Sequence, residues 1–284
     1  MASADLLTPH TREGKDALAA LLARPERAVV ALDFDGTLAP IVPDPERARA
    51  DPGAVPALAR LAPRLAAVVV ITGRPAGVAV RYGGFAGVPG LDSLVVLGHY
   101  GAERWDARTG EVQAPAAHPG ITAVRAELPG FLDRIGAWHG TWIEDKGGRA
   151  VAVHTRRTED PGAALEALRG PLTELAELHG VMVEPGRYVL ELRPPGMDKG
   201  VALSRYLDEV DALGVVYAGD DLGDLPAFGA VEERRERGLP GLLVASAGTD
   251  EAPPELLARA DLAVPGPPGV VSFLDSLATT LTPG

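Results

Sequence analysis

Short apolar segments alternate with segments of helical spacing along most of this chain. A run of four or five apolar residues is typical of a strand buried on both faces, because half-buried strands alternate between apolar and polar residues. The expected strands are residues 28–32, 67–71, 94–97, 215–218, 242–245 and 262–264. The expected helices between and before them include 16–24, 55–65, a stretch ending near 82, and 200–207. This alternation predicts an α/β fold with a doubly wound, Rossmann-like parallel sheet.

The middle of the chain has a different order of expected helices and strands. Residues 114–194 predict the order helix, hairpin, helix, hairpin, which is typical of an α+β unit with an antiparallel sheet. The expected helices are 121–138 and 161–179, and the expected hairpin strands are 141–145 with 150–155, and 181–184 with 188–192 around Pro185-Gly186. We therefore expect a core built from residues 1–113 and 195–284, with an inserted cap domain at 114–194.

Composition excludes several classes of function. The formal net charge of −12 makes the chain a poor ligand for nucleic acid or for an anionic membrane. The absence of cysteine excludes disulfides, thiolate metal sites and cysteine nucleophiles. The longest hydrophobic runs have seven residues, whereas a membrane span needs about 20. We expect a soluble, cytoplasmic monomer of about two domains, with no nucleic-acid or membrane partner.

The strongest motif directly follows the first expected strand. It reads Asp33-Phe34-Asp35-Gly36-Thr37. An aspartate at the tip of a strand can attack a phosphorus atom and form an acyl phosphate. The second carboxyl group can protonate the leaving oxygen and later take a proton from water. Gly36 lets the chain turn and brings backbone N–H groups toward a phosphate. The alternative is an ordinary turn, in which Asp and Gly are common.

Two single residues add to this motif. Thr72 ends the second expected strand, where its hydroxyl could bind a phosphate oxygen or simply cap the strand. Lys199 opens a helix, and its ammonium could offset the repulsion between Asp33 and an anionic substrate. Only three of the 27 basic residues are lysine, Lys15, Lys146 and Lys199. A lysine in a chain whose other basic residues are arginine can mark a place where arginine would not serve. The alternative is that each lysine survives by chance, with Lys199 as a solvated charge at the start of a helix.

A cluster of carboxylates follows the strand at 215–218. Asp220, Asp221 and Asp224 crowd one loop, and a hard cation such as Mg²⁺ relieves such crowding with oxygen ligands. An acidic loop that caps the next helix is the alternative. Ligand sites of doubly wound sheets lie at the carboxyl ends of the strands, where all of these polar groups are expected. Six scattered histidines form no zinc-type spacing, and the charged run at 232–237 is expected to be a solvated loop or helix end.

Together, these motifs resemble those of the haloacid-dehalogenase (HAD) superfamily of aspartate-nucleophile phosphotransferases. The resemblance implies that Asp33 is the nucleophile and Asp35 the general acid and base, with Thr72 and Lys199 on the phosphate. It also implies Mg²⁺ held by Asp33, by the carbonyl of Asp35 and by Asp220, with support from Asp221 and Asp224.

A narrower resemblance, to the trehalose-6-phosphate phosphatases, covers most of the chain. Beside the first motif, it rests on Thr72-Gly73-Arg74-Pro75, His99-Tyr100-Gly101-Ala102-Glu103, Glu144-Asp145-Lys146, Val153-His154-Thr155-Arg156 and Glu191-Leu192-Arg193-Pro194. It implies a large α+β cap and substrate or phosphate contacts by Gly73, Arg74 and His99. It further implies recognition of sugar hydroxyls by Glu144, Lys146 and Glu191. His99 and His154 are expected to be hydrogen-bonded neighbours and not catalytic bases.

The resemblance implies a Mg²⁺-dependent hydrolysis of trehalose 6-phosphate through an aspartyl phosphate. Gly223, Leu225 and Pro226 depart from the family pattern near the acidic cluster. Three alternatives stay open. They are a phosphatase of another sugar phosphate, such as sucrose phosphate or mannosylglycerate phosphate, a HAD-type sugar phosphomutase, and an inactive binding module, against which the complete set of charged motif residues argues.

Overall fold

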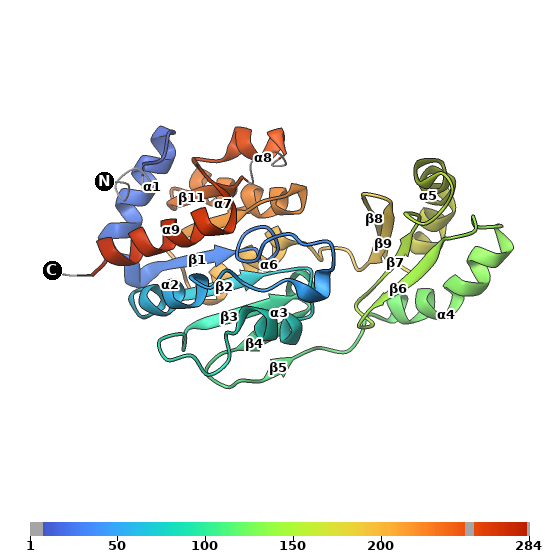
Figure 1. Ribbon diagram of the computed structural model, residues 1–284, viewed down its shortest axis with the longest axis horizontal. Coiled ribbons are helices and arrows are strands. Elements are labelled where there is room, and N and C mark those ends of the chain that lie inside the picture. Colours follow the sequence, from blue (N-terminus) through green and yellow to red (C-terminus); the bar gives the residue numbers. More distant parts are fainter. Residues whose placement is uncertain (1–7, 248–252, 283–284) are drawn as a thin grey trace. The chain divides into compact units, whose positions relative to one another are not determined.

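The computed structural model describes residues 8–247 and 253–282. It divides into two compact units, each with its own sheet (Figure 1). The first unit contains the residues up to Ala114 and those from Asp198 onward, and the second contains Pro115–Met197. The second unit is therefore an insertion in the chain of the first. That catalysis belongs to one unit and substrate selection to the other stays a prediction.

The sheet of the first unit has eight strands within the described residues. They are β1 (Ala28–Leu32), β2 (Ala67–Ile71), β3 (Leu94–Gly98), β4 (Glu103–Asp106), β5 (Val112–Gln113), β10 (Gly214–Gly219), β11 (Gly241–Ser246) and β12 (Leu262–Val264). Their order is β12-β11-β10-β1-β2-β3-β4-β5. The strands from β12 to β3 are parallel, which confirms the predicted sheet, whereas β4 and β5 are antiparallel. The short, partly polar β4 and β5 lack the apolar runs that identified the other strands.

Helices cover both faces of this sheet. They are α1 (Arg12–Ala23), α2 (Ala54–Leu61), α3 (Ala76–Gly83), α6 (Lys199–Glu209), α7 (Leu225–Glu236), α8 (Pro254–Arg259) and α9 (Gly266–Thr280). Successive residues of a strand point to opposite faces. Accordingly, Val30 and Leu32 pack in one core cluster with α1, α2, α3 and α9, whereas Val29 and Ala31 pack in another with α6, α7 and α8. Burial on both faces explains why the strands are continuously apolar.

The second unit has a four-stranded antiparallel sheet. Its strands are β6 (Trp142–Lys146), β7 (Ala150–His154), β8 (Met182–Gly186) and β9 (Val189–Arg193), in the order β6-β7-β9-β8. Its helices are α4 (Pro119–Arg134) and α5 (Pro161–Leu178). The apolar strand residues pack with both helices around Leu128 and Leu172. The alternate strand residues, including Glu144, Lys146 and Glu191, therefore lie on the other, polar face of the sheet.

Two local expectations from the sequence were wrong, and a third was right only in part. The helix expected at 121–138 ends at Arg134. The turn was expected at Pro185-Gly186, but both residues belong to β8. The turn follows them, where Tyr188 takes the left-handed conformation. The charged run at 232–237 forms the end of α7, which was one of the two expected alternatives. Its Arg234 is buried and not solvated, and it donates to Asp208 and to the Ala212 carbonyl. No helix in the described part of the chain is long and apolar enough to span a membrane.

Candidate active site

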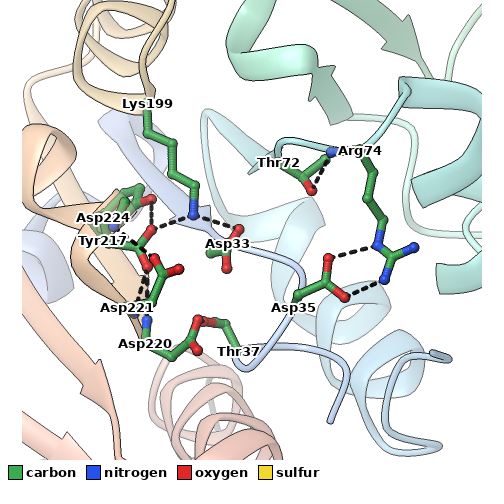
Figure 2. Close-up of polar contacts among 11 residues, drawn as sticks. Asp33, Asp35, Thr37, Thr72, Arg74, Lys199, Tyr217, Asp220, Asp221 and Asp224 are labelled. Atoms are coloured by element: carbon green, nitrogen blue, oxygen red, sulfur yellow. Dashed lines mark hydrogen bonds and ion pairs between the residues drawn. The ribbon is translucent and has the colours of Figure 1, made fainter. Parts of the chain in front are cut away.

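Two adjacent strands bring the main acidic groups together. β1 pairs with β10 in register, with Leu32 beside Ala218, so the residues that follow each strand emerge side by side. The backbone N–H of Asp33 donates to the Ala218 carbonyl at 2.9 Å. Carboxylate oxygens of Asp33, Asp220 and Asp224 lie within 4.8 Å of one another. The polar groups at these strand ends therefore form one cluster (Figure 2).

Lys199 is shared between two of these carboxylates. Its Nζ lies 2.8 Å from Asp33 Oδ1 and 2.7 Å from Asp224 Oδ1, and all three side chains are buried. Lys199 opens α6, whose N-terminus is capped by the Asp198 carboxylate. Burial opposes the charged lysine, but Asp224 and Asp33 overcome it and raise the pKa of Lys199 well above its usual value. The ammonium is thus fixed beside the candidate nucleophile.

Asp224 anchors the loop after β10. Its Oδ1 also accepts from the hydroxyl of Tyr217 at 2.6 Å, and its Oδ2 accepts from the backbone N–H groups of Asp220 and Asp221. Burial opposes the charge of Asp224, yet Lys199 holds its pKa below the usual value. Both oxygens of Asp224 are therefore engaged with protein donors. The sequence reasoning missed Tyr217, whose only signal was a hydroxyl within an apolar strand, where it needs a partner.

The remaining carboxylates of the cluster are poorly compensated. Burial, opposed in part by Lys199, raises the pKa of Asp33 to about 7. Burial and the proximity of Asp33 raise the pKa of Asp220 to about 10. Two adjacent carboxylates resist simultaneous ionisation unless a cation lies between them. This oxygen donor set fits a hard divalent cation such as Mg²⁺, and Asp33 and Asp220 are the residues whose side chains could hold it.

The other two predicted metal residues lie differently. The Asp221 carboxylate accepts from the Gly223 N–H at 2.9 Å and caps the short helical turn Leu222–Asp224. The Asp35 side chain is not among the carboxylates grouped in this cluster. Their contribution to a metal site stays a prediction.

Asp35 is held by Arg74. The guanidinium donates from Nε to Asp35 Oδ2 and from Nη2 to Asp35 Oδ1, both at 2.6 Å, and from Nη1 to the Pro45 carbonyl at 3.0 Å. It lies 5.4 Å from the ring centroid of Tyr82. Figure 2 shows the Asp35 carboxylate facing Arg74, while Lys199 reaches Asp33. The sequence predicted that Arg74 contacts the phosphate. In the structure, its guanidinium instead donates two hydrogen bonds to the carboxylate of Asp35, the candidate general acid and base.

A strained turn supports the loop that carries Thr72 and Arg74. Thr72 is buried, and its hydroxyl accepts from the Arg74 N–H at 3.2 Å. The N–H of His99 donates to the Arg74 carbonyl, and that of Tyr100 to the Thr72 carbonyl. His99 and Tyr100 have φ of 46° and 55°, a conformation that non-glycine residues adopt at a cost. A Cβ on Gly73 would lie 2.7 Å from the Tyr100 hydroxyl. His99 thus acts on this loop through its backbone.

Gly36 allows the first motif to approach the acidic cluster. Its φ is +79°, and an added Cβ would lie 1.9 Å from Asp220 Oδ2. Its carbonyl accepts from the buried Ser246 hydroxyl at 2.7 Å. The Thr37 hydroxyl lies 3.5 Å from Asp220 Oδ1. Ser246 was missed because it ends a strand that the sequence marks only as core.

In the second unit, the three predicted sugar-recognition residues share the polar face of the sheet. Lys146 Nζ lies 2.5 Å from Glu191 Oε2, and Glu144 Oε2 lies 2.7 Å from the His154 Nε2. Glu191 is 8% exposed, and its Oε1 is buried without a hydrogen-bond partner among the described residues. A buried carboxylate oxygen in this state requires a donor from elsewhere.

Comparison with known proteins places this arrangement in a family. The chain matches the trehalose-phosphatase family over residues 31–255. The trehalose-phosphate phosphatase of Mycobacterium bovis (strain BCG) is 33% identical over 270 residues, covering 92% of this chain and 63% of that protein. The trehalose-phosphate phosphatase of Mycobacterium marinum is 34% identical over 235 residues, covering 78% and 57%. The chain thus spans less than two thirds of the length of these relatives.

Solved structures share the fold. A trehalose-6-phosphate phosphatase of Aspergillus fumigatus aligns with a TM-score of 0.71 and 23% identity, over 96% of this chain and 99% of that one. A haloacid dehalogenase-like hydrolase from Bacteroides thetaiotaomicron aligns with a TM-score of 0.59 and 19% identity, over 87% and 98%. These likenesses confirm the predicted HAD-type fold. Together with the match over residues 31–255, the mycobacterial relatives show that the chain belongs to the trehalose-phosphatase family.

Proposed function

We propose that this protein is a Mg²⁺-dependent phosphatase that hydrolyses trehalose 6-phosphate to trehalose and phosphate. The observation that carries the proposal is the buried Lys199, which joins Asp33 to Asp224 beside Asp220 in a chain of this family. A fixed ammonium next to a buried carboxylate neutralises part of the charge that would repel a phosphate dianion. This is the arrangement that an aspartate nucleophile needs for phosphoryl transfer.

The reaction would proceed in two transfers. Asp33 attacks the phosphorus atom, the bond from phosphorus to the sugar oxygen breaks, and Asp35 gives its proton to that oxygen. Asp35 then takes a proton from a water molecule, whose oxygen attacks the phosphorus of the aspartyl phosphate and releases Asp33 with inorganic phosphate. Thr72 and Lys199 bind phosphate oxygens in both steps. Mg²⁺, held by Asp33, the Asp35 carbonyl and Asp220, would supply positive charge to the transferring phosphoryl group.

Selection of the sugar would belong to the second unit. The polar face of its sheet offers the Lys146 ammonium, the exposed Glu144 carboxylate and Glu191 Oε1, which has no hydrogen-bond partner in the described part of the chain. A disaccharide presents many hydroxyl groups that both donate and accept, and such directional groups match this set. The same set could serve another disaccharide phosphate, so sucrose phosphate and mannosylglycerate phosphate are the closest rival substrates. A cytoplasmic location and a monomeric state belong to the same proposal.

The test is a phosphate-release assay with a panel of sugar phosphates and the Asp33→Asn variant as blank. We expect trehalose 6-phosphate to be hydrolysed with the highest kcat/KM, well above sucrose 6-phosphate and glucose 6-phosphate. A higher value for another sugar phosphate would replace the substrate while keeping the chemistry. Isomerised sugar phosphate without free phosphate would identify a phosphomutase instead. No reaction with any member of the panel would contradict the proposal.

A further inference from the structure

An aromatic stack lies next to Glu144 on the polar face of the second unit's sheet. Trp142 of β6 is directly opposite His154 of β7. The indole and imidazole rings are nearly parallel, at 7°, with their centroids 4.4 Å apart. The guanidinium carbon of Arg157 lies 4.4 Å from the centroid of the Trp142 ring. The Trp142 and His154 rings are therefore packed against each other in a defined orientation.

This stack aims one nitrogen of His154 at Glu144. The two residues are on paired strands and on the same face, and the His154 Nε2 lies 2.7 Å from Glu144 Oε2. The Glu144 side chain is 49% exposed, whereas that of His154 is 20% exposed. His154 thus holds one oxygen of the carboxylate, and the rest of the group faces outward, able to accept from a ligand.

We propose that His154, fixed by the stack on Trp142, is a positioning residue that orients Glu144 for contact with a hydroxyl group of the sugar. The inference rests on the proposed function in one respect, the contact between Glu144 and the sugar. His154 itself does not touch the substrate. The hydrogen bond from His154 and, to a lesser degree, the nearby Lys146 lower the pKa of Glu144, so the carboxylate stays an acceptor.

The geometry distinguishes this pair from an ordinary surface ion pair. Exposed pairs of flexible side chains contribute little, because both partners lose conformational freedom when they meet. Here the imidazole is already immobilised by the indole, so it directs Glu144 at little further entropic cost. Binding gains from such preorganisation, because the carboxylate does not have to be ordered when the sugar arrives.

The second unit contains a matched control. The His179 Nε2 lies 3.0 Å from Glu127 Oε2, and its side chain is 20% exposed, as is that of His154. Glu127 belongs to α4 and His179 follows α5, so this pair lies in the helical layer and not on the polar face of the sheet. A general effect of losing a histidine–glutamate pair on this unit's stability would appear in both variants.

The experiment is a double-mutant cycle of His154→Ala and Glu144→Ala, with His179→Ala as control. The readouts are kcat and KM for trehalose 6-phosphate and for 4-nitrophenyl phosphate, with thermal melting to follow folding. We expect His154→Ala to lower kcat/KM for trehalose 6-phosphate about 10-fold, mainly through KM, the size of one charged hydrogen bond. In the Glu144→Ala background the same change should cost less than about 2-fold. His154→Gln keeps a donor at the same reach and should restore part of the loss.

Three patterns of results separate the possible failures. If Glu144→Ala impairs trehalose 6-phosphate turnover but His154→Ala does not, or if the two losses simply add, the positioning role is overturned and the proposed function stands. If Glu144→Ala leaves trehalose 6-phosphate turnover unchanged, the sugar contact itself fails and the inference fails with it. Equal losses on both substrates, or an equal loss in His179→Ala, would also overturn it, because they would indicate a structural role.

Discussion

At the scale of single residues, the ammonium group of Lys199 fixes the position of the carboxylate of Asp33, the candidate nucleophile. Lys199 contacts both Asp33 and Asp224, and the latter is also fixed by Tyr217. Removing Lys199 would leave both buried carboxylates without their cation, which costs several kcal/mol, about 3–5 for a buried pair. The chemistry is thus best tested by substitutions that keep the size of the side chain and remove one chemical property, such as its charge.

The first prediction concerns Asp33→Asn. The amide has the same size but is a much weaker nucleophile, and it removes a charge from a crowded cluster, so the fold should survive. Uncatalysed phosphate-monoester hydrolysis is among the slowest known reactions, and enzymes accelerate it up to ~10²¹-fold. We therefore expect kcat to fall by several powers of ten while the melting temperature is kept. Retention of more than about a tenth of the activity in a clean preparation would exclude Asp33 as nucleophile.

The second prediction concerns Arg74→Ala, which releases the Asp35 carboxylate. A sugar alkoxide needs a proton in order to leave, whereas 4-nitrophenolate does not, so misplacing the acid should affect the two substrates unequally. We expect kcat/KM to fall about 100-fold or more for trehalose 6-phosphate and far less for 4-nitrophenyl phosphate. Arg81→Ala is the matched control, because Arg81 also lies over the Tyr82 ring, at 5.1 Å. Equal losses on both substrates would instead support a phosphate contact by Arg74.

The sequence predicted which residues gather at the site but not how they pair. Asp33, Thr72 and Asp220 could be placed because each follows an apolar strand, and neighbouring parallel strands end at the same edge. The pairing of Arg74 with Asp35, and of Tyr217 with Asp224, depends on side-chain directions and on register across the sheet. A single sequence does not encode these in any local pattern.

At the scale of elements, the site depends on loops that approach one another closely. The third prediction concerns Gly36→Ala, where a Cβ would enter the space of the Asp220 carboxylate and φ is +79°. We expect kcat to drop by at least about 100-fold, because moving a catalytic group by about 1 Å can lower the rate by this factor. Gly84→Ala is a control that introduces the backbone strain of a positive φ without a steric clash of the added Cβ. Its φ is +68° with no atom within 4 Å of the added Cβ, so it should cost only about 1 kcal/mol of stability and leave kcat unchanged. Similar activity in both variants would contradict the close approach.

The fourth prediction concerns the metal, which would lie between the loops that follow β1 and β10. Exhaustive chelation should abolish turnover, Mg²⁺ should restore it, and Ca²⁺ should inhibit because its coordination is longer and looser. Asp220→Asn should raise the Mg²⁺ concentration needed for half-maximal activity more than Asp221→Asn, since the Asp221 carboxylate is engaged by the Gly223 N–H. Full activity after chelation would remove the metal from the mechanism.

The elements that the sequence predicted best are those with both faces buried. β1, β2 and β12 have the expected bounds, β3 is one residue longer at one end, and β10 and β11 are one residue longer at each end, because the apolar runs that identified these strands are uninterrupted. The end of α7 was one of two alternatives for the charged run at 232–237, but the burial of Arg234 between Asp208 and the Ala212 carbonyl was not expected, because a run of charged residues usually lies in solvent. The antiparallel β4 and β5 were missed because tertiary pairing, and not an apolar run, makes them strands.

At the scale of the whole molecule, the two units have separate cores and present different sets of polar side chains. The first unit holds the buried lysine and the acidic cluster. The second holds a polar sheet face with a buried acceptor, Glu191 Oε1, that has no partner among the described residues. Binding energy from a remote sugar can be used to align the reacting phosphate. We therefore propose that the chemistry belongs to the first unit and the selection of the sugar to the second.

The most direct test of this division is kcat/KM of Lys146→Ala and Glu144→Ala for two substrates, trehalose 6-phosphate and 4-nitrophenyl phosphate. For the sugar phosphate we predict a loss of roughly 10- to 1,000-fold, as expected for one or two buried polar contacts. The aryl phosphate carries no sugar, so its value should stay within about 3-fold of the unmodified protein, within the error of comparing preparations. Equal losses on both substrates, or no loss on either, would contradict the division of labour.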